Sequence, residues 1–191
     1  MFIEEYPGAV DAALCERIIA LFEADPRRAP STANVNGQPS THSLRSGTHL
    51  VCDTSGEWDE VVNAIIPALQ STIGLYAQKY TALKTVIETE GLVCTGPVIE
   101  RVDPGQGFAW HYDQTSYSRQ RVLAGLLYLS AIKDGGHTEF KEQGYNIQPE
   151  TGKIALFPPY WTHLHRGVSP TTETKYVISF FWIYGKDVPA S

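Results

Sequence analysis

The chain has little of what marks a protein that binds nucleic acid, enters a membrane or is held together by disulfides. Fifteen basic residues stand against twenty-one acidic ones, a net charge of −6, which argues against broad binding to nucleic acid or to an anionic membrane. The three cysteines, an odd number, show no metal-binding spacing, so we expect reduced thiols in a reducing compartment. The composition predicts a cytoplasmic protein without nucleic-acid or membrane partners.

Long hydrophobic runs and internal repeats are also absent. No apolar stretch approaches the roughly 20 residues that a membrane-spanning helix needs, and Met1–Glu5 lacks the basic region of a signal peptide. The apolar content of 42% suffices for one substantial core, because chains of this size bury about 70% of their extended surface. We predict one domain over residues 1–191, with a helical part at 1–90 and a catalytic β core at 91–185.

Two segments near the start of the chain show helical periodicity. The first, 12–24, follows the N-cap candidate Asp11 and stops before Pro26. The second, 57–80, carries an apolar stripe along its whole length, although Pro67 is expected to kink or divide it. The sequence therefore predicts two amphipathic helices, each with one face to bury.

The rest of the chain lacks helical periodicity. Segment 25–56 is rich in Pro, Ser, Thr, Asn and Gly, which predicts a disordered loop or a lid over a substrate. From Leu92 onward, short β-branched and aromatic runs alternate with Gly and Pro turns, the pattern of an antiparallel sandwich or barrel. We expect a mainly β, α+β protein whose helices cover one face of a sheet.

A candidate metal site is formed by His111, Asp113 and His165. Alternation along a strand turns His111 and Asp113 to the same face. Two imidazoles and one carboxylate on one face of a metal are the ligands of non-haem Fe(II) oxygenases, and they leave positions open for substrate chemistry. The His-x-Asp pattern alone is weak evidence for a metal site, because chance produces it in about one such chain in four. His163 competes with His165, since residues two apart on an extended segment share a face.

A lysine ten residues after His165 adds a fixed cation. Lys175 shares its strand face with Val177, Ser179 and Phe181, and small or apolar neighbours around one ammonium favour an inward position over a solvated one. A buried ammonium needs a partner. The lysine could therefore hold the carboxylate of an anionic co-substrate near the metal.

Six segments follow one another in a recognisable order from residue 99 to 184. They are His111-Tyr112-Asp113, Tyr128-Leu129-Ser130, Gly135-Gly136-His137-Thr138-Glu139-Phe140, residues 149–158, His165-Arg166-Gly167-Val168-Ser169-Pro170, and Lys175. This ordered set resembles the 2-oxoglutarate and Fe(II)-dependent oxygenases of the prolyl 4-hydroxylase type. The resemblance covers nearly half the chain, and the first ninety residues contribute little to it.

The resemblance implies a fold and a metal site. The fold would be a double-stranded β-helix, a jelly-roll or cupin-like core over 92–184 with supporting N-terminal helices. The metal would be Fe(II), bound by His111, Asp113 and His165, because the family pattern places the second histidine before Gly-x-x-Pro and so selects His165 over His163. The metal mouth would be bordered by the 25–56 segment and by residues 114–120.

The resemblance also implies a cosubstrate and a reaction. Lys175 and Tyr128 would bind the distal carboxylate of 2-oxoglutarate, with Thr138 as a weaker candidate, whereas the residues alone also allow Tyr128 to be a core tyrosine. O2 would be the oxidant, and ascorbate is a further candidate cofactor. The implied activity is a dioxygenase that hydroxylates an unactivated C–H bond with succinate and CO2 as co-products.

The substrate is less closely defined. Arg121 matches an arginine that helps to bind peptide in prolyl 4-hydroxylases, but Phe181 and Ile183 depart from the family's Trp-x-His. These departures favour a small amino acid or another carboxylate-bearing metabolite, since arginine can grip a carboxylate with two hydrogen bonds. A prolyl or peptidyl residue stays open, as does a non-catalytic cupin-like binding module. The substrate-contacting candidates are Arg101, Trp110, Arg119, Arg121 and His163.

Overall fold

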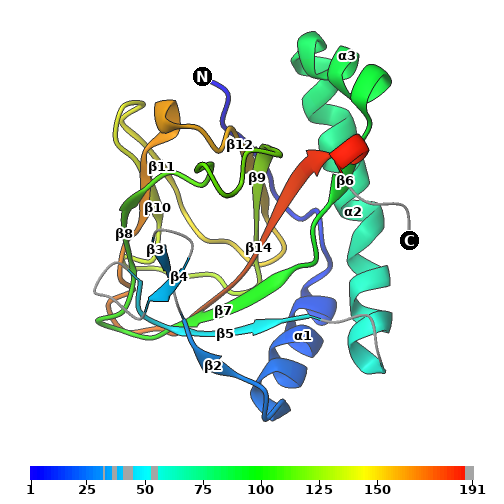
Figure 1. The fold of residues 1–191 in the computed structure, drawn as a ribbon. Helices are drawn as coiled ribbons and strands as arrows, with labels where there is room; N and C mark the ends of the chain where they lie inside the picture. Colours follow the sequence, from blue (N-terminus) through cyan, green and yellow to red (C-terminus); the bar gives the residue numbers. More distant parts are fainter. Residues whose placement is uncertain (32, 36–37, 41–44, 53–55, 188–191) are drawn as a thin grey trace.

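Two antiparallel β-sheets face each other across the interior of the molecule. The computed structural model describes residues 1–31, 33–35, 38–40, 45–52 and 56–187. The larger sheet has the strand order β1-β12-β9-β14-β7-β5-β2, with β6 also paired to β14, and the smaller sheet has the order β11-β10-β13-β8 (Figure 1). Side chains from both sheets, among them Phe140, Phe157 and Val177, meet in one buried cluster. The sheets therefore form the two walls of a jelly-roll core.

The strands are short, as the alternating runs in the sequence predict. The larger sheet contains β1 (Glu4–Tyr6), β2 (Ala29–Pro30), β5 (Thr48–Val51), β6 (Leu92–Cys94), β7 (Val98–Val102), β9 (Arg121–Tyr128), β12 (Ile154–Phe157) and β14 (Lys175–Tyr184). The smaller sheet contains β8 (Phe108–His111), β10 (Thr138–Phe140), β11 (Tyr145–Ile147) and β13 (His165–Gly167). A separate hairpin pairs β3 (Ala33–Val35) with β4 (Gln38–Ser40).

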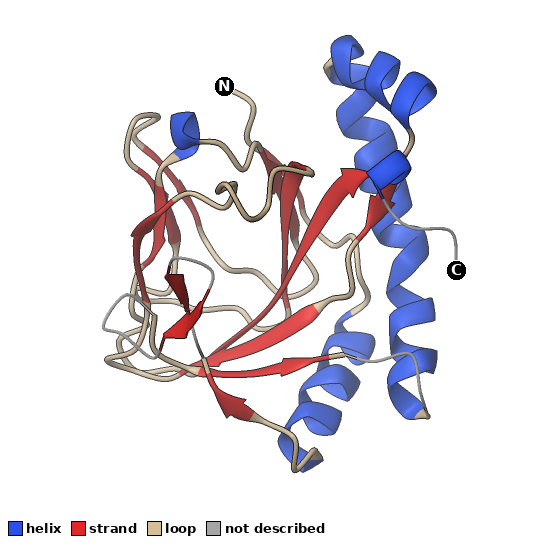
Figure 2. Ribbon diagram, viewed as in Figure 1, coloured by secondary structure: helices blue, strands red, loops and turns tan. Residues whose placement is uncertain are grey.

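Helices cover the outer face of the larger sheet (Figure 2). They are α1 (Ala12–Ala24), α2 (Glu57–Lys79) and α3 (Thr81–Glu90), and short 3-10 turns occur at η1 (Trp161–His163) and η2 (Gly185–Asp187). Phe22 of α1 and Ile65 of α2 pack in one buried cluster with Ile178 of β14. Ile178 and Phe180 point to this cluster, so alternation sends Val177 and Phe181 to the opposite face of the strand, toward the other sheet.

The predicted helix at 12–24 is confirmed. The carboxylate of Asp11 accepts a hydrogen bond from the Ala13 amide at 2.8 Å, which is the expected N-cap. The second helix runs through Pro67 without division, because buried residues on both sides, such as Ile65 and Leu69, each contribute about 1.5–3 kcal/mol against the roughly 3 kcal/mol cost of an internal proline.

Two features of the fold differ from the sequence expectation. The 25–56 segment is not simply a loop: it contains β2, β3, β4 and β5, and β5 pairs with β7 through Thr48 and Arg101. The N-terminal ninety residues also supply β1 to the edge of the larger sheet, next to β12. The β core therefore draws on both parts of the chain. Residues 32, 36–37, 41–44 and 53–55 of this segment lie outside the described residues. No helix in the described part of the chain is long and apolar enough to span a membrane.

Candidate metal and cosubstrate site

Two neighbouring strands of the smaller sheet bring the three predicted metal ligands together. In the pairing of β8 with β13, His111 stands opposite His165. Asp113 follows β8 and is fixed by its backbone amide, which donates to the Pro159 carbonyl at 3.0 Å. One carboxylate oxygen of Asp113 lies 3.7 Å from His111 Nε2 and the other lies 3.6 Å from His165 Nε2. One ligand atom from each residue lies within 4.8 Å of the others, so a single ion can be held by all three.

Hydrogen bonds set both imidazoles in the form that binds a metal. Nδ1 of His111 lies 2.8 Å from the Ala109 carbonyl, and Nδ1 of His165 lies 2.9 Å from the His163 carbonyl. A carbonyl only accepts, so each Nδ1 donates and each Nε2 keeps its lone pair for the ion. Burial and the neighbouring His165 lower the pKa of His111 to about 4, which keeps that ring neutral. The donor set fits Fe(II).

His163 does not join this group. It lies in the 3-10 turn η1, where its Nδ1 contacts the Thr162 hydroxyl at 3.0 Å. The expectation that His163 and His165 share a face assumed an extended segment, and the turn removes that condition. His163 instead contributes its backbone carbonyl, which orients the His165 ring.

A cavity of about 950 Å³ opens over the three residues. Both segments predicted to border the metal mouth line it: Arg45 and Ser46 come from the first, and Thr115 to Ser118 come from the second. Aromatic rings form much of the wall near the ligands. The Phe108 ring stacks on His111 with centroids 3.6 Å apart, and the Phe157 ring lies edge-on to His165 at 4.9 Å. These rings make the wall beside the two histidines apolar.

Lys175 lies at one side of the cavity as a buried cation. Its Nζ donates to the Gly136 carbonyl at 2.7 Å and lies 5.4 Å from the centroid of the Tyr128 ring. Among the residues that the structure describes, no carboxylate lies within ion-pair distance of Lys175. Burial lowers the pKa of its ammonium to about 8. A buried ammonium without a counter-ion, facing a cavity, is suited to receive an anionic ligand.

The two other predicted cosubstrate residues take different positions. Thr138 lines the cavity, whereas Tyr128 is fully buried and is not part of the lining. The Tyr128 hydroxyl lies 2.8 Å from the Thr138 hydroxyl. Thr138 therefore meets the cavity directly and Tyr128 lies behind it in hydrogen-bond contact, and the roles of both in binding the cosubstrate stay predictions.

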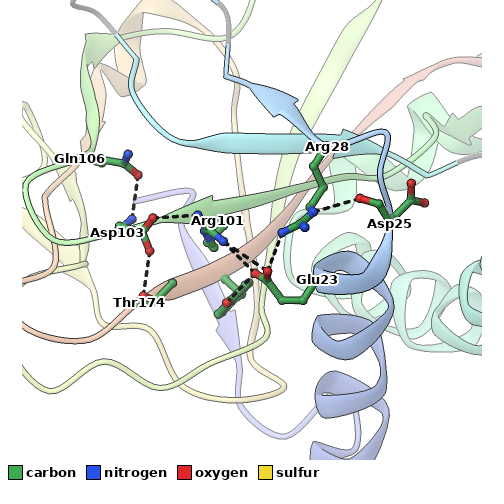
Figure 3. Close-up of polar contacts among 8 residues, drawn as sticks. Glu23, Asp25, Arg28, Arg101, Asp103, Gln106 and Thr174 are labelled. Atoms are coloured by element: carbon green, nitrogen blue, oxygen red, sulfur yellow. Dashed lines mark hydrogen bonds and ion pairs between the residues drawn. The ribbon is translucent and has the colours of Figure 1, made fainter.

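The predicted substrate residues separate into two groups. Trp110 and Arg121 line the cavity. Arg101 does not: alternation along β7 turns it away from the cavity, where its guanidinium pairs with Glu23 and Asp103, each at 3.2 Å (Figure 3). Arg119 and His163 also lie outside the cavity lining. Arg101, Arg119 and His163 thus lie outside the lining of this cavity, and their role as substrate residues stays a prediction.

Two charged residues of the cavity wall were not predicted from the sequence. Glu100 lies between Val98 and Val102, and all three residues line the cavity. Strict alternation along this strand would have found Glu100 once its inner face was known. Arg45 comes from the segment taken as a loop, where the sequence carries no signal of its position.

Comparison with known proteins agrees with this site. Residues 98–184 match the model of the 2OG-Fe(II) oxygenase superfamily. A probable prolyl 4-hydroxylase 9 of Arabidopsis thaliana is 28% identical over 95% of this chain and 68% of its own length. The fold and the site define a non-haem iron dioxygenase that uses 2-oxoglutarate and O2. Within that class the chain is similar to enzymes of the prolyl 4-hydroxylase type, and the match to the 2OG-Fe(II) oxygenase superfamily extends over residues 98–184.

Solved structures show the same fold. The viral collagen prolyl hydroxylase of Paramecium Bursaria Chlorella virus-1 superposes with a TM-score of 0.68 at 17% identity, over 95% of this chain and 96% of that one. A Trichoplax adhaerens prolyl hydroxylase, solved with a hypoxia inducible factor peptide fragment, gives 0.75 at 14% identity, over 96% and 84%. The double-stranded β-helix predicted from the sequence is confirmed.

Proposed function

We propose that this dioxygenase hydroxylates an unactivated C–H bond of a small amino acid or another carboxylate-bearing metabolite, with succinate and CO2 as co-products. Fe(II) would be held by His111, Asp113 and His165. The observation that carries the proposal is the arrangement of three kinds of group in one cavity: the metal ligands, the buried Lys175, and Arg121 as a further cation.

The protein's own contribution is to bind and orient. Bound Fe(II) supplies the activation of O2 that is coupled to oxidative decarboxylation of 2-oxoglutarate. Lys175 would hold the distal carboxylate of 2-oxoglutarate through a charge-assisted hydrogen bond, with Thr138 beside it. The aromatic wall around His111 and His165 keeps water away from the reacting centre.

Arg121 supports a carboxylate-bearing substrate. It lines the cavity, its Nη1 donates to the backbone carbonyl of Asp113 at 2.8 Å, and its guanidinium carbon lies 3.6 Å from the Phe181 ring centroid. Within the described residues it forms no ion pair with a carboxylate. Its planar group is thus fixed beside a metal ligand, where it can bind a substrate carboxylate with two hydrogen bonds.

A prolyl or peptidyl substrate is the second candidate. The Arabidopsis relative and the two solved structures described above are prolyl hydroxylases by name, and one was solved with a peptide fragment. Tyr112 and Tyr117, which line the cavity, are 45% and 69% exposed, so they offer an aromatic rim that a longer chain could contact.

A mass-spectrometric screen separates these candidates. The purified protein, with Fe(II), 2-oxoglutarate and O2, would be incubated with free amino acids, small carboxylates and proline-containing peptides. We expect a +16 product and matching succinate with members of the first two groups. A +16 product with peptides alone would contradict the small-molecule proposal, and no stimulated succinate with any compound would favour the non-catalytic binding module.

The organisation of the chain is part of the same proposal. The predicted single domain is supported by the buried cluster that joins α1 and α2 to the larger sheet. Cys15 and Cys94 carry free thiols, and burial raises the pKa of Cys15 to about 11 and that of Cys94 to about 12, so both stay protonated. A cytoplasmic location and the absence of nucleic-acid and membrane partners stay predictions.

A further inference from the structure

An acidic side chain that is not a metal ligand faces the cavity from β7. Glu100 is 9% exposed and lies between two valines of the cavity wall. Its carboxylate is paired with Arg45, whose Nε donates to Oε2 at 3.2 Å and whose second nitrogen contacts Oε1. An ionised carboxylate on an otherwise apolar strand face costs free energy unless it is paired. Arg45 supplies the cationic partner that a carboxylate needs at this position in the wall of the site.

The pair is anchored to the strand that carries a metal ligand. Arg45 forms a backbone bridge with Phe108 of β8, and its guanidinium carbon lies 4.9 Å from the Phe108 ring centroid. The same ring stacks on His111. The next residue, Ser46, exchanges hydrogen bonds with Gly107 at 2.9 and 3.0 Å. The Phe108 ring therefore contacts both the arginine of the ion pair and a metal ligand.

The charged side chains that line the cavity indicate which charged groups its ligands would carry. The cations are Arg45, Arg121 and Lys175, and the carboxylates are Glu100 and Asp113. Fe(II) brings two positive charges and 2-oxoglutarate two negative ones, so these cancel. One positive charge remains among the described lining residues, which favours a substrate carboxylate; an ammonium is favoured by the position of Glu100 in the wall and not by this sum. The carboxylate that is neither a metal ligand nor supplied by the cosubstrate is Glu100, and it has lone pairs to offer to an ammonium.

We propose that Glu100 is a specificity-determining residue that accepts the ammonium group of a zwitterionic substrate, a free amino acid, with Arg45 as its positioning residue. This inference rests on the proposed function, in which Arg121 binds the substrate carboxylate. A peptide or N-acylated amino acid has no ammonium at that position, so it would leave Glu100 buried beside a neutral group. A site built around a buried polar group rejects ligands that fail to pair with it.

Burial of the pair is better explained by specificity than by stability. Replacing a buried ion pair by apolar side chains of similar volume is often neutral or stabilising, because desolvation offsets the attraction between the charges. A pair in the hydrophobic core could thus be lost without penalty. This one lies in the wall of a cavity within reach of a ligand, where its charges select what binds.

The first test uses the unmodified enzyme and needs no variant. Free amino acids and their N-acetyl derivatives are compared as stimulators of succinate formation. Each is then titrated calorimetrically under anaerobic conditions with Fe(II) and 2-oxoglutarate present, which measures binding without turnover. For the amino acid that stimulates most strongly, we expect N-acetylation to weaken binding at least tenfold. Equal binding of the two forms would overturn the role of Glu100 and leave the small-carboxylate function intact.

A variant pair tests the residue itself. Glu100→Gln should weaken binding of the free amino acid at least tenfold and leave binding of its N-acetyl form within about twofold. The difference in affinity between the two forms, which measures the discrimination, should then be lost. Glu100→Asp should retain part of it. Glu23→Gln is the matched control, because Glu23 also pairs with an arginine at β7 but on the face away from the cavity; its discrimination should equal that of the unmodified enzyme.

The outcomes separate this inference from the proposed function. Unchanged discrimination in folded Glu100→Gln overturns the inference alone. Turnover of peptides with no binding of any free amino acid or small carboxylate overturns both the inference and the small-molecule proposal. If Glu100→Gln fails to fold, the comparison of free and N-acetylated substrates on the unmodified enzyme still decides.

Discussion

Each face of β7 contributes one residue to an ion pair between an arginine and a glutamate, and the two pairs have different surroundings. On the outer face, Arg101 is paired with Glu23 of α1 (Figure 3), and the Tyr176 hydroxyl donates to the same glutamate at 2.8 Å. On the inner face, Glu100 is paired with Arg45 at the cavity wall. The outer pair joins a helix to a sheet, whereas the inner pair faces the space above the metal position. The position of an ion pair in the fold, and not its residue types, therefore determines whether it can contact a ligand.

The same contrast holds for the two buried lysines. Lys153 has carboxylate partners, Glu5 at 2.8 Å and Glu150 at 2.6 Å. Lys175 has a backbone carbonyl and, among the described residues, no carboxylate. Lys153 therefore completes a structural network, while Lys175 has its charge available for a ligand. The predictions below use these paired sites.

Loss of a metal ligand should have the largest effect. His111→Ala, Asp113→Ala and His165→Ala should each reduce turnover beyond the roughly 10- to 100-fold that loss of an outer hydrogen-bond partner of a ligand costs. Iron content by elemental analysis and succinate formation measure this. His163→Ala is the control and should retain iron, since its backbone carbonyl is kept. Loss of iron in the His163 variant with retention in the His165 variant would reverse the ligand assignment.

Removing the cation at the cosubstrate end should have the next largest effect. Lys175→Ala should weaken 2-oxoglutarate binding roughly ten- to a hundredfold, because a charge-assisted contact is worth about 1.5–3 kcal/mol. Iron binding should change far less. Lys153→Ala should lower thermal stability but leave the 2-oxoglutarate titration unchanged. An identical titration midpoint for Lys175→Ala and the unmodified protein would show that the distal carboxylate lies elsewhere.

The pH dependence of 2-oxoglutarate binding sharpens the same contrast. Burial lowers the pKa of Lys175 to about 8, so the unliganded amine is charged below that pH and neutral above it. Binding needs the charged form. The apparent Kd should therefore be level below pH 8 and rise about tenfold per pH unit above it, as measured by anaerobic calorimetry. Lys175→Ala should lack this rise, and a level Kd from pH 7 to 9 in the unmodified protein would contradict the assignment.

Removing the outer pair of β7 should have the smallest effect. Arg101→Met should cost about 1 kcal/mol or less of unfolding free energy, because both partners are partly exposed to solvent. Thermal unfolding measures this loss, and kcat/KM should stay within about twofold of the unmodified value. A large rise in KM for the substrate with little loss of stability would return Arg101 to the substrate site.

The metal half of the site was predictable because its signals are local. His111 ends β8 and Asp113 follows it by two residues, and Asp11 caps its own helix. The substrate half was not, because Arg45 and Glu100 are 55 positions apart and meet only when β5 pairs with β7. The inward face of β7 is likewise set by its register with β14, and a slip of one residue would exchange Glu100 and Arg101.

The origin of Arg45 has a consequence for redesign. The residue that orients Glu100 lies between α1 and α2, whereas the metal ligands and Lys175 all follow residue 110. Arg45 and Glu100 thus precede the metal ligands and Lys175 in the gene, whereas Arg121 lies between two of the ligands. Exchange of the stretch between α1 and α2, together with position 100, would change one part of the cavity wall and keep the metal ligands, Lys175 and Arg121 in the sequence.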